Sequence, residues 1–74
     1  MNWITTIELG KFLIAHPNNE YECRMKLGGG VGSTHWWYFD SDRQCFQHSR
    51  DIDYSMVSPQ EFLTYYKDCL WRIE

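Results

Sequence analysis

The sequence has no run of apolar residues that approaches the roughly 20 needed for a membrane-spanning helix, and it shows no pattern typical of a secretory signal. Positive charge is also scarce, because seven Lys and Arg stand against ten Asp and Glu, a net charge of −3. Proteins that bind nucleic-acid backbones in general carry clustered Lys and Arg, so the composition argues against that class. We therefore expect a cytoplasmic protein that contacts neither a membrane nor nucleic acid directly.

Cysteine is scarce as well, and its spacing fits no disulfide framework. The three thiols Cys23, Cys45 and Cys69 are odd in number and far apart, so we expect them to be reduced and mostly buried. Cys45-x-x-His48 has the spacing of a zinc half-site, but a structural zinc site usually takes two such pairs and the sequence offers one. We expect no metal and no cofactor.

Glycine is concentrated in residues 28–33, which lack the other residues of a phosphate-binding fingerprint. A P-loop has Lys after its glycines and this segment has none, whereas G-x-G-x-x-G would need glycine in place of Ser33. We expect a flexible loop here, followed by a strand. Two interpretations stay open: a plain connection, or a mobile loop whose backbone N–H groups, among them those of Gly29 and Gly30, close over an anion.

Aromatic residues are what the chain has in excess. Four Trp, five Tyr and four Phe make up 18% of 74 residues, a length that allows one domain over residues 1–74. A domain of this size buries only roughly 60% of the surface of its unfolded chain, and an enclosed ring takes about 150–250 Å² of it. We therefore expect some rings to line a pocket or a subunit contact.

Two capping boxes and one alternating segment predict the fold. Thr5-Thr6-Ile7-Glu8 starts a helix that Pro17 ends at His16, and Ser58-Pro59-Gln60-Glu61 starts a second helix that runs to about Asp68. Between them, apolar and charged residues alternate over 20–27, as in a strand with one buried face. Further strands are predicted at 35–39, 45–48, 51–56 and 69–73. The fold class is α+β, a small antiparallel sheet of about four to five strands with both helices on one face.

The aromatic strand at 35–39 divides its rings between two faces. Trp36 and Tyr38 point one way, and His35, Trp37 and Phe39 point the other. One set fills the core under the helices, and the other is left to stack on a base or to pack against a second subunit. The sequence does not say which. Cysteine and histidine are the residue types of a nucleophile and its base, but nothing orders them, so we predict a protein that is not an enzyme.

This combination of elements resembles a class of small phage-encoded inhibitors of bacterial defence. It is most similar to the second type of Thoeris anti-defence protein, the nucleotide sponges. The matching stretches are 7–16, 21–26, 28–37 and 58–68, with the ending Asp68-Cys69-Leu70-Trp71-Arg72-Ile73. This chain departs from the family in having two residues between Asp68 and Trp71, and in being shorter through its middle.

The resemblance implies a homo-oligomer that binds a cyclic ADP-ribose-type signal at subunit contacts and sequesters it without cleaving it, in the host cytoplasm if a phage encodes it. An arginine on the charged face of a strand suits a phosphate because its bonds are local and bidentate. The tryptophans would stack on the base, and the hydroxyls and loop amides would reach ribose or phosphate. The expected site residues are Arg24, Gly29, Gly30, Ser33, Thr34, Trp36 and Trp37.

Two other functions remain open. An anti-CRISPR-like inhibitor would bind a host defence protein directly through a broad acidic and aromatic surface, whereas a sponge needs a concave site that combines Arg and aromatic rings. A structural or regulatory adaptor would form an oligomer and bind no ligand. The acidic residues that could imitate a row of phosphates, or simply form a solvated face, are Glu20, Glu22, Asp40, Asp42, Asp51 and Asp53.

Overall fold

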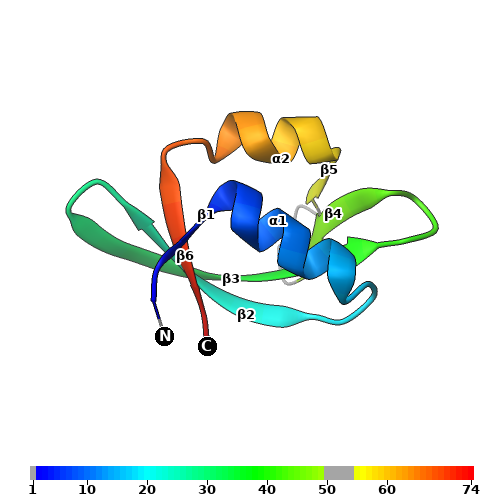
Figure 1. The fold of residues 1–74 in the computed structure, drawn as a ribbon, viewed down its shortest axis with the longest axis horizontal. Coiled ribbons are helices and arrows are strands. Elements are labelled where there is room, and N and C mark those ends of the chain that lie inside the picture. Colours follow the sequence, from blue (N-terminus) through cyan, green and yellow to red (C-terminus); the bar gives the residue numbers. More distant parts are fainter. Residues whose placement is uncertain (1, 50–54) are drawn as a thin grey trace.

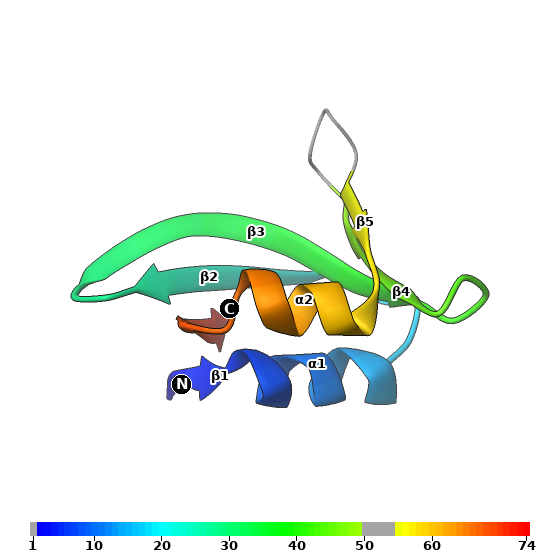
Figure 2. The same cartoon turned by 90° about the horizontal axis from the view of Figure 1, so that it is seen from above.

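The computed structural model describes residues 2–49 and 55–74, and it confirms the α+β class. In this described part, six antiparallel strands form one sheet in the order β1-β6-β2-β3-β4-β5, where the sequence predicted about four to five. Figure 2 shows both helices on the same side of this sheet. The elements are β1 Ile4–Thr5, α1 Thr6–Ala15, β2 Tyr21–Leu27, β3 Gly30–Asp40, β4 Cys45–His48, β5 Ser55–Val57, α2 Pro59–Tyr65 and β6 Cys69–Ile73 (Figure 1).

Both helices begin at the predicted capping boxes. The Glu8 N–H donates to Thr5 Oγ1 at 3.2 Å and the Thr5 N–H donates to Glu8 Oε1 at 2.9 Å; Ser58 and Glu61 repeat the arrangement at 3.1 and 2.9 Å. Helix α2 ends at Tyr65, earlier than the predicted end near Asp68. The Tyr66 carbonyl instead accepts hydrogen bonds from Thr6 Oγ1 at 2.6 Å and from the Cys69 N–H at 3.0 Å, which turns the chain into β6.

The predicted glycine loop over residues 28–33 is wrong, because β3 already begins at Gly30 and the turn is only two residues long. Gly28 takes φ 64°, a left-handed conformation that favours glycine. The register between β2 and β3 shifts beyond this turn, as in a β-bulge. A Cβ at Gly32 would lie 2.8 Å from the Met25 carbonyl oxygen, so the bulge also requires glycine there.

Register decides which face of each strand meets the helices. Tyr21 pairs with Trp37, and Cys23 pairs with His35, so the four side chains point to the same face. Cys23 and Trp37 are fully buried in the core, which identifies this face as the helix-covered one. Trp36 and Tyr38 therefore point to the opposite face, which answers the question that the aromatic strand left open. The buried core contains Leu9, Leu13, Cys23, Trp37, Phe39, Phe46, Phe62, Cys69 and Trp71.

All three cysteines are free and buried, as predicted. Burial raises the pKa of Cys23 to about 12, and it also raises the pKa values of Cys45 and Cys69. A reactive cysteine needs a lowered pKa, so these thiols act as small apolar groups of the core.

Two stretches differ from the expectation at the ends of the sheet. Strand β1 was not predicted, because two residues are too short to show a periodic pattern; it pairs Ile4 with Trp71 of β6. The predicted strand over 51–56 lies largely outside the described residues, and its described part, 55–56, belongs to β5, Ser55–Val57. Neither described helix is long and apolar enough to cross a membrane.

Candidate functional site

The seven predicted site residues do not come together in one place. Arg24 and Thr34 are cross-strand partners on the face that points away from the helices, and Trp36 follows on the same face opposite Glu22. Ser33 instead bonds to His35 on the helix-covered side, at 3.0 Å. The remaining two glycines lie at the tip of the β2–β3 hairpin, which extends past the helices in Figure 1. Gly29 and Gly30 have open space around them.

Trp37 was predicted as one of two rings that could stack on a base, and this prediction is wrong because the ring is inaccessible to a ligand. Its side chain is 0% exposed. The rings of His48, Phe62 and Tyr66 pack against it edge-on, with centroids 5.0, 5.0 and 5.7 Å away. Such a ring contributes to the core through burial and aromatic contacts. Trp36 is the member of the pair that remains accessible for binding.

We call the side of the sheet that neither described helix covers the open face. Its side chains follow from the register of β6, β2 and β3, since cross-strand partners point to the same side. Cations, carboxylates and indole rings alternate over it, and most are half-buried. The residues of the open face that matter below are Trp3, Glu22, Arg24, Lys26, Thr34, Trp36, Arg72 and Glu74.

Two arginines of the open face share one carboxylate. Arg24 of β2 is the direct cross-strand partner of Arg72 of β6. Arg24 Nε donates to Glu74 Oε1 at 3.0 Å, while Arg72 donates from Nε to Oε2 and from Nη2 to Oε1, both at 3.3 Å. The hydrogen bonds of Arg24 and then of Arg72 hold the pKa of Glu74 below its ordinary value. The carboxylate is therefore ionised at neutral pH and neutralises part of a paired positive charge.

An indole ring adjoins this arginine pair. The Cζ of Arg72 lies 5.0 Å, and the Nζ of Lys26 lies 5.3 Å, from the ring centroid of Trp3. Both distances are within the range of a cation–π interaction. Trp3, Arg72 and Glu74 were not predicted from the sequence, because they reach the site only through the pairing of β1 and β6 with strands distant in sequence. A strand signal at residues 69–73 was the one clue to their position.

A chain of hydrogen bonds on the helix-covered side was also missed. Ser33 Oγ lies 3.0 Å from His35 Nε2, and His35 Nδ1 lies 2.8 Å from His48 Nε2. This order of hydroxyl and imidazoles is that of a nucleophile, a base and an orienting group. Acyl transfer also needs donors aimed at the developing oxyanion, and these residues do not line the groove between the two helices. The buried Nδ1 of His48 has no hydrogen-bond partner in the part of the chain that the structure describes.

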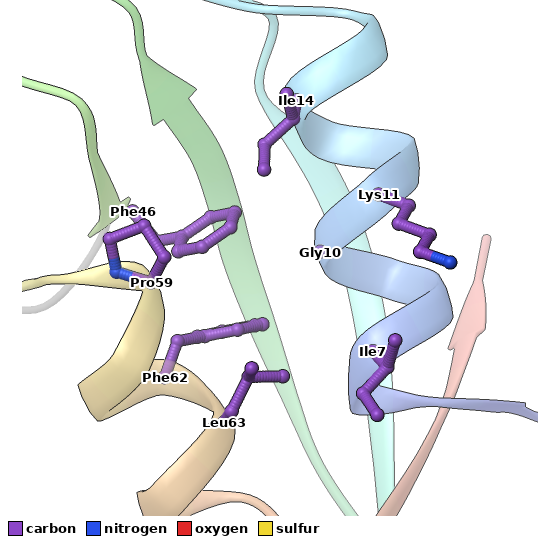
Figure 3. Close-up of a pocket in the computed structure, with 8 residues that line it drawn as sticks. All are labelled: Ile7, Gly10, Lys11, Ile14, Phe46, Pro59, Phe62 and Leu63. Carbon is purple, nitrogen blue, oxygen red and sulfur yellow. The ribbon is translucent and has the colours of Figure 1, made fainter.

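A groove opens between the two helices, away from all predicted site residues (Figure 3). Its volume is about 180 Å³, and it is lined by Ile7, Gly10, Lys11, Ile14, Phe46, Pro59, Phe62 and Leu63. We call this feature the helix groove. Figure 3 shows Phe46 and Phe62 pointing into the gap, while Lys11 points away from it. Ile7, Ile14 and Leu63 at its rim are 55%, 47% and 40% exposed.

Among the acidic residues that could imitate phosphates, Asp40 has a structural role. The carboxylate of Asp40 accepts bonds from the backbone of Asp42, and from the backbone and side chain of Arg43, so it organises a turn and does not present a negative surface. Asp51 and Asp53 lie outside the described residues. Over residues 2–49 and 55–74, no three His, Cys, Asp or Glu side chains converge to hold a metal ion.

Comparison of the chain with known protein families, with curated proteins and with solved structures finds no match.

Proposed function

We propose that the protein is a non-enzymatic anti-defence protein of a phage or mobile element, which binds and sequesters a cyclic nucleotide-type signal in the cytoplasm as a homo-oligomer. The observation that carries the proposal is the composition of the open face. Arg24, Thr34 and Trp36 lie there on neighbouring strands, so a cation, a hydroxyl and an accessible indole are within the reach of one small ligand.

Each group has a part in recognising a nucleotide. An arginine binds a phosphate through two parallel N–H donors, which makes the bond directional even on a chain with a net charge of −3. An indole can stack on any of the nucleobases, because each of them has a flat aromatic face. Sequestration requires affinity alone, and so these groups are sufficient without a nucleophile or a metal.

Calorimetric titration of the protein with a panel of cyclic nucleotides and ADP-ribose isomers tests the proposal. We expect one of them to bind, and Arg24→Ala to weaken that binding at least tenfold because the phosphate loses its partner. Lys11→Ala is the matched control, since it removes the same charge from the helix side and should leave the affinity within twofold of wild type. Absence of heat with every compound would refute the proposal, and sedimentation of the unliganded protein checks the oligomer.

Direct inhibition of a host defence protein is the second candidate, and the helix groove favours it. Ile7, Ile14 and Leu63 stand exposed around an apolar floor on the side that the nucleotide proposal does not use. Exposed apolar surface of this kind is typical of a protein–protein contact. Leu63→Lys would then abolish inhibition of the defence system while leaving the open face intact, whereas Arg24→Ala would have no effect on inhibition.

A further inference from the structure

The two arginines of the open face repel each other, and an anion between them relieves that repulsion. Like charges directly opposite each other on neighbouring strands are destabilising, and Arg24 and Arg72 occupy such positions. The Glu74 carboxylate relieves the repulsion by accepting three charge-assisted hydrogen bonds from the two guanidinium groups. The strand pairing thus builds a two-arginine anion site, and a side chain of the same protein occupies it.

We propose that this site binds a phosphate or diphosphate group of the ligand, which displaces the Glu74 carboxylate and takes over its bonds to Arg24 and Arg72. The existence of the site is independent of the proposed function, but the assignment of its ligand as a nucleotide rests on that function. The proposal adds Arg72 as a second phosphate-binding residue and makes Glu74 an internal competitor.

The surroundings allow the exchange. The side chains of Arg24, Arg72 and Glu74 are 36%, 35% and 28% exposed, so solvent and solutes reach all three. Surface ion pairs of this kind contribute little net stability, and their breakage costs correspondingly little. A diphosphate brings more charge and more acceptor oxygens than one carboxylate, and it can accept the forked donors of both arginines at once.

The charges nearby favour an incoming anion once Glu74 has moved away. Within the described strands β2 and β6, this face then presents the cations Arg24, Lys26 and Arg72, against the carboxylate of Glu22. Trp3 lies beside two of these cations, and its indole offers a stacking surface next to the phosphate position. A ligand with both a phosphate and a flat ring makes use of both parts, whereas an inorganic phosphate makes use of one. The site therefore fits a nucleoside diphosphate group best.

Glu74→Gln separates this site from a general effect of charge. The variant removes the competing carboxylate charge, and we expect it to bind inorganic pyrophosphate at least fivefold more tightly than wild type in calorimetry at low ionic strength. Glu22→Gln is the matched control, because it removes the same charge from the same face, and its affinity should stay within twofold of wild type. Adding Arg72→Ala to Glu74→Gln should abolish the gain. Equal affinity of Glu74→Gln and wild type, or an equal gain in Glu22→Gln, would overturn the proposal.

Two further arms identify the source of the phosphate. ADP should bind Glu74→Gln more tightly than pyrophosphate does, and Trp3→Ala should remove that difference. A single-stranded oligonucleotide that binds more tightly than ADP would overturn the assignment to a free nucleotide. If Glu74→Gln gains affinity for pyrophosphate but no cyclic nucleotide binds, the site stands and the proposed function fails. If a cyclic nucleotide binds both proteins equally, the proposed function stands and this inference fails.

Discussion

The two faces of the sheet are made from alternate residues of the same strands, yet they differ in almost every physical property. The helix-covered face consists of rings, thiols and aliphatic side chains that are nearly all buried. On the open face, two half-buried arginines form ion pairs with the Glu74 carboxylate, and the indole of Trp3 lies against Lys26 and Arg72. The aromatic residues are therefore divided between two places, because one set of rings builds the core while Trp3 and Trp36 lie half-buried on the open face.

The largest expected effect contrasts two neighbouring tryptophans. Trp37→Ala removes a fully buried ring and should lower the free energy of unfolding by about 3–5 kcal/mol, as truncation of core aromatics does. Trp36→Ala acts on the open face and should cost at least about 2 kcal/mol less, while weakening nucleotide binding. Urea unfolding measures both. Equal losses for the two variants would show that the open face belongs to the core.

A smaller effect is expected at the glycines of the β2–β3 hairpin. Gly32→Ala places a methyl group 2.8 Å from the Met25 carbonyl oxygen, a backbone atom that cannot move cheaply. We expect a loss of roughly 1–3 kcal/mol, as for other substitutions that overfill a packed site. Gly29→Ala, with nothing within 4 Å, is the control and should leave thermal unfolding nearly unchanged. A stable Gly32→Ala protein would contradict the assigned bulge.

The smallest effect is the dependence of stability on pH, to which the helix caps and the open face both contribute. Hydrogen bonds lower the pKa values of Glu8 and Glu61 at the helix caps, and of Glu74 on the open face, from 4.5. A carboxyl group with a lowered pKa in the folded state stabilises the protein above its unfolded value, and this stabilisation is lost as pH falls through the folded value. Stability should therefore fall as the pH drops below about 4.5, measured by thermal unfolding between pH 7 and pH 3. A Glu74→Gln variant should show a shallower fall, and an identical profile would contradict the role of that carboxylate.

Local patterns predicted the parts of the fold that are decided locally. Each capping box closes within four residues, and the alternation over 20–27 shows directly which side chains share a face. The same reasoning placed Arg24 on the charged face of its strand, and it placed Trp36 on a strand without deciding which face its ring occupies. The glycine segment was misjudged because a two-residue turn followed by a bulge depends on the pairing partner, and glycine-rich composition alone does not distinguish this from a loop.

The rest of the candidate site depends on contacts between distant residues. Glu74 meets Arg24 across 50 positions of sequence, and no local periodicity marks such a pair. The interpretation of Trp37 as one of two possible stacking rings needed the register of β3 to be decided. Burial by α2 and β4 then removed it from the site.

The strand order also has a consequence for how the protein is made. Strand β6 lies between β1 and β2, so β1 has no strand to pair with, and β2 has only β3, until residues 69–73 are present. In a nascent chain that still holds this segment inside the ribosome, β1 would be separated from the rest of the sheet, and Cys23 of β2 would lack its partner Ile73 of β6. Folding dominated by such distant pairings proceeds only after synthesis has passed that point. The complete sheet, with its two faces, can therefore form only after β6 has been synthesised.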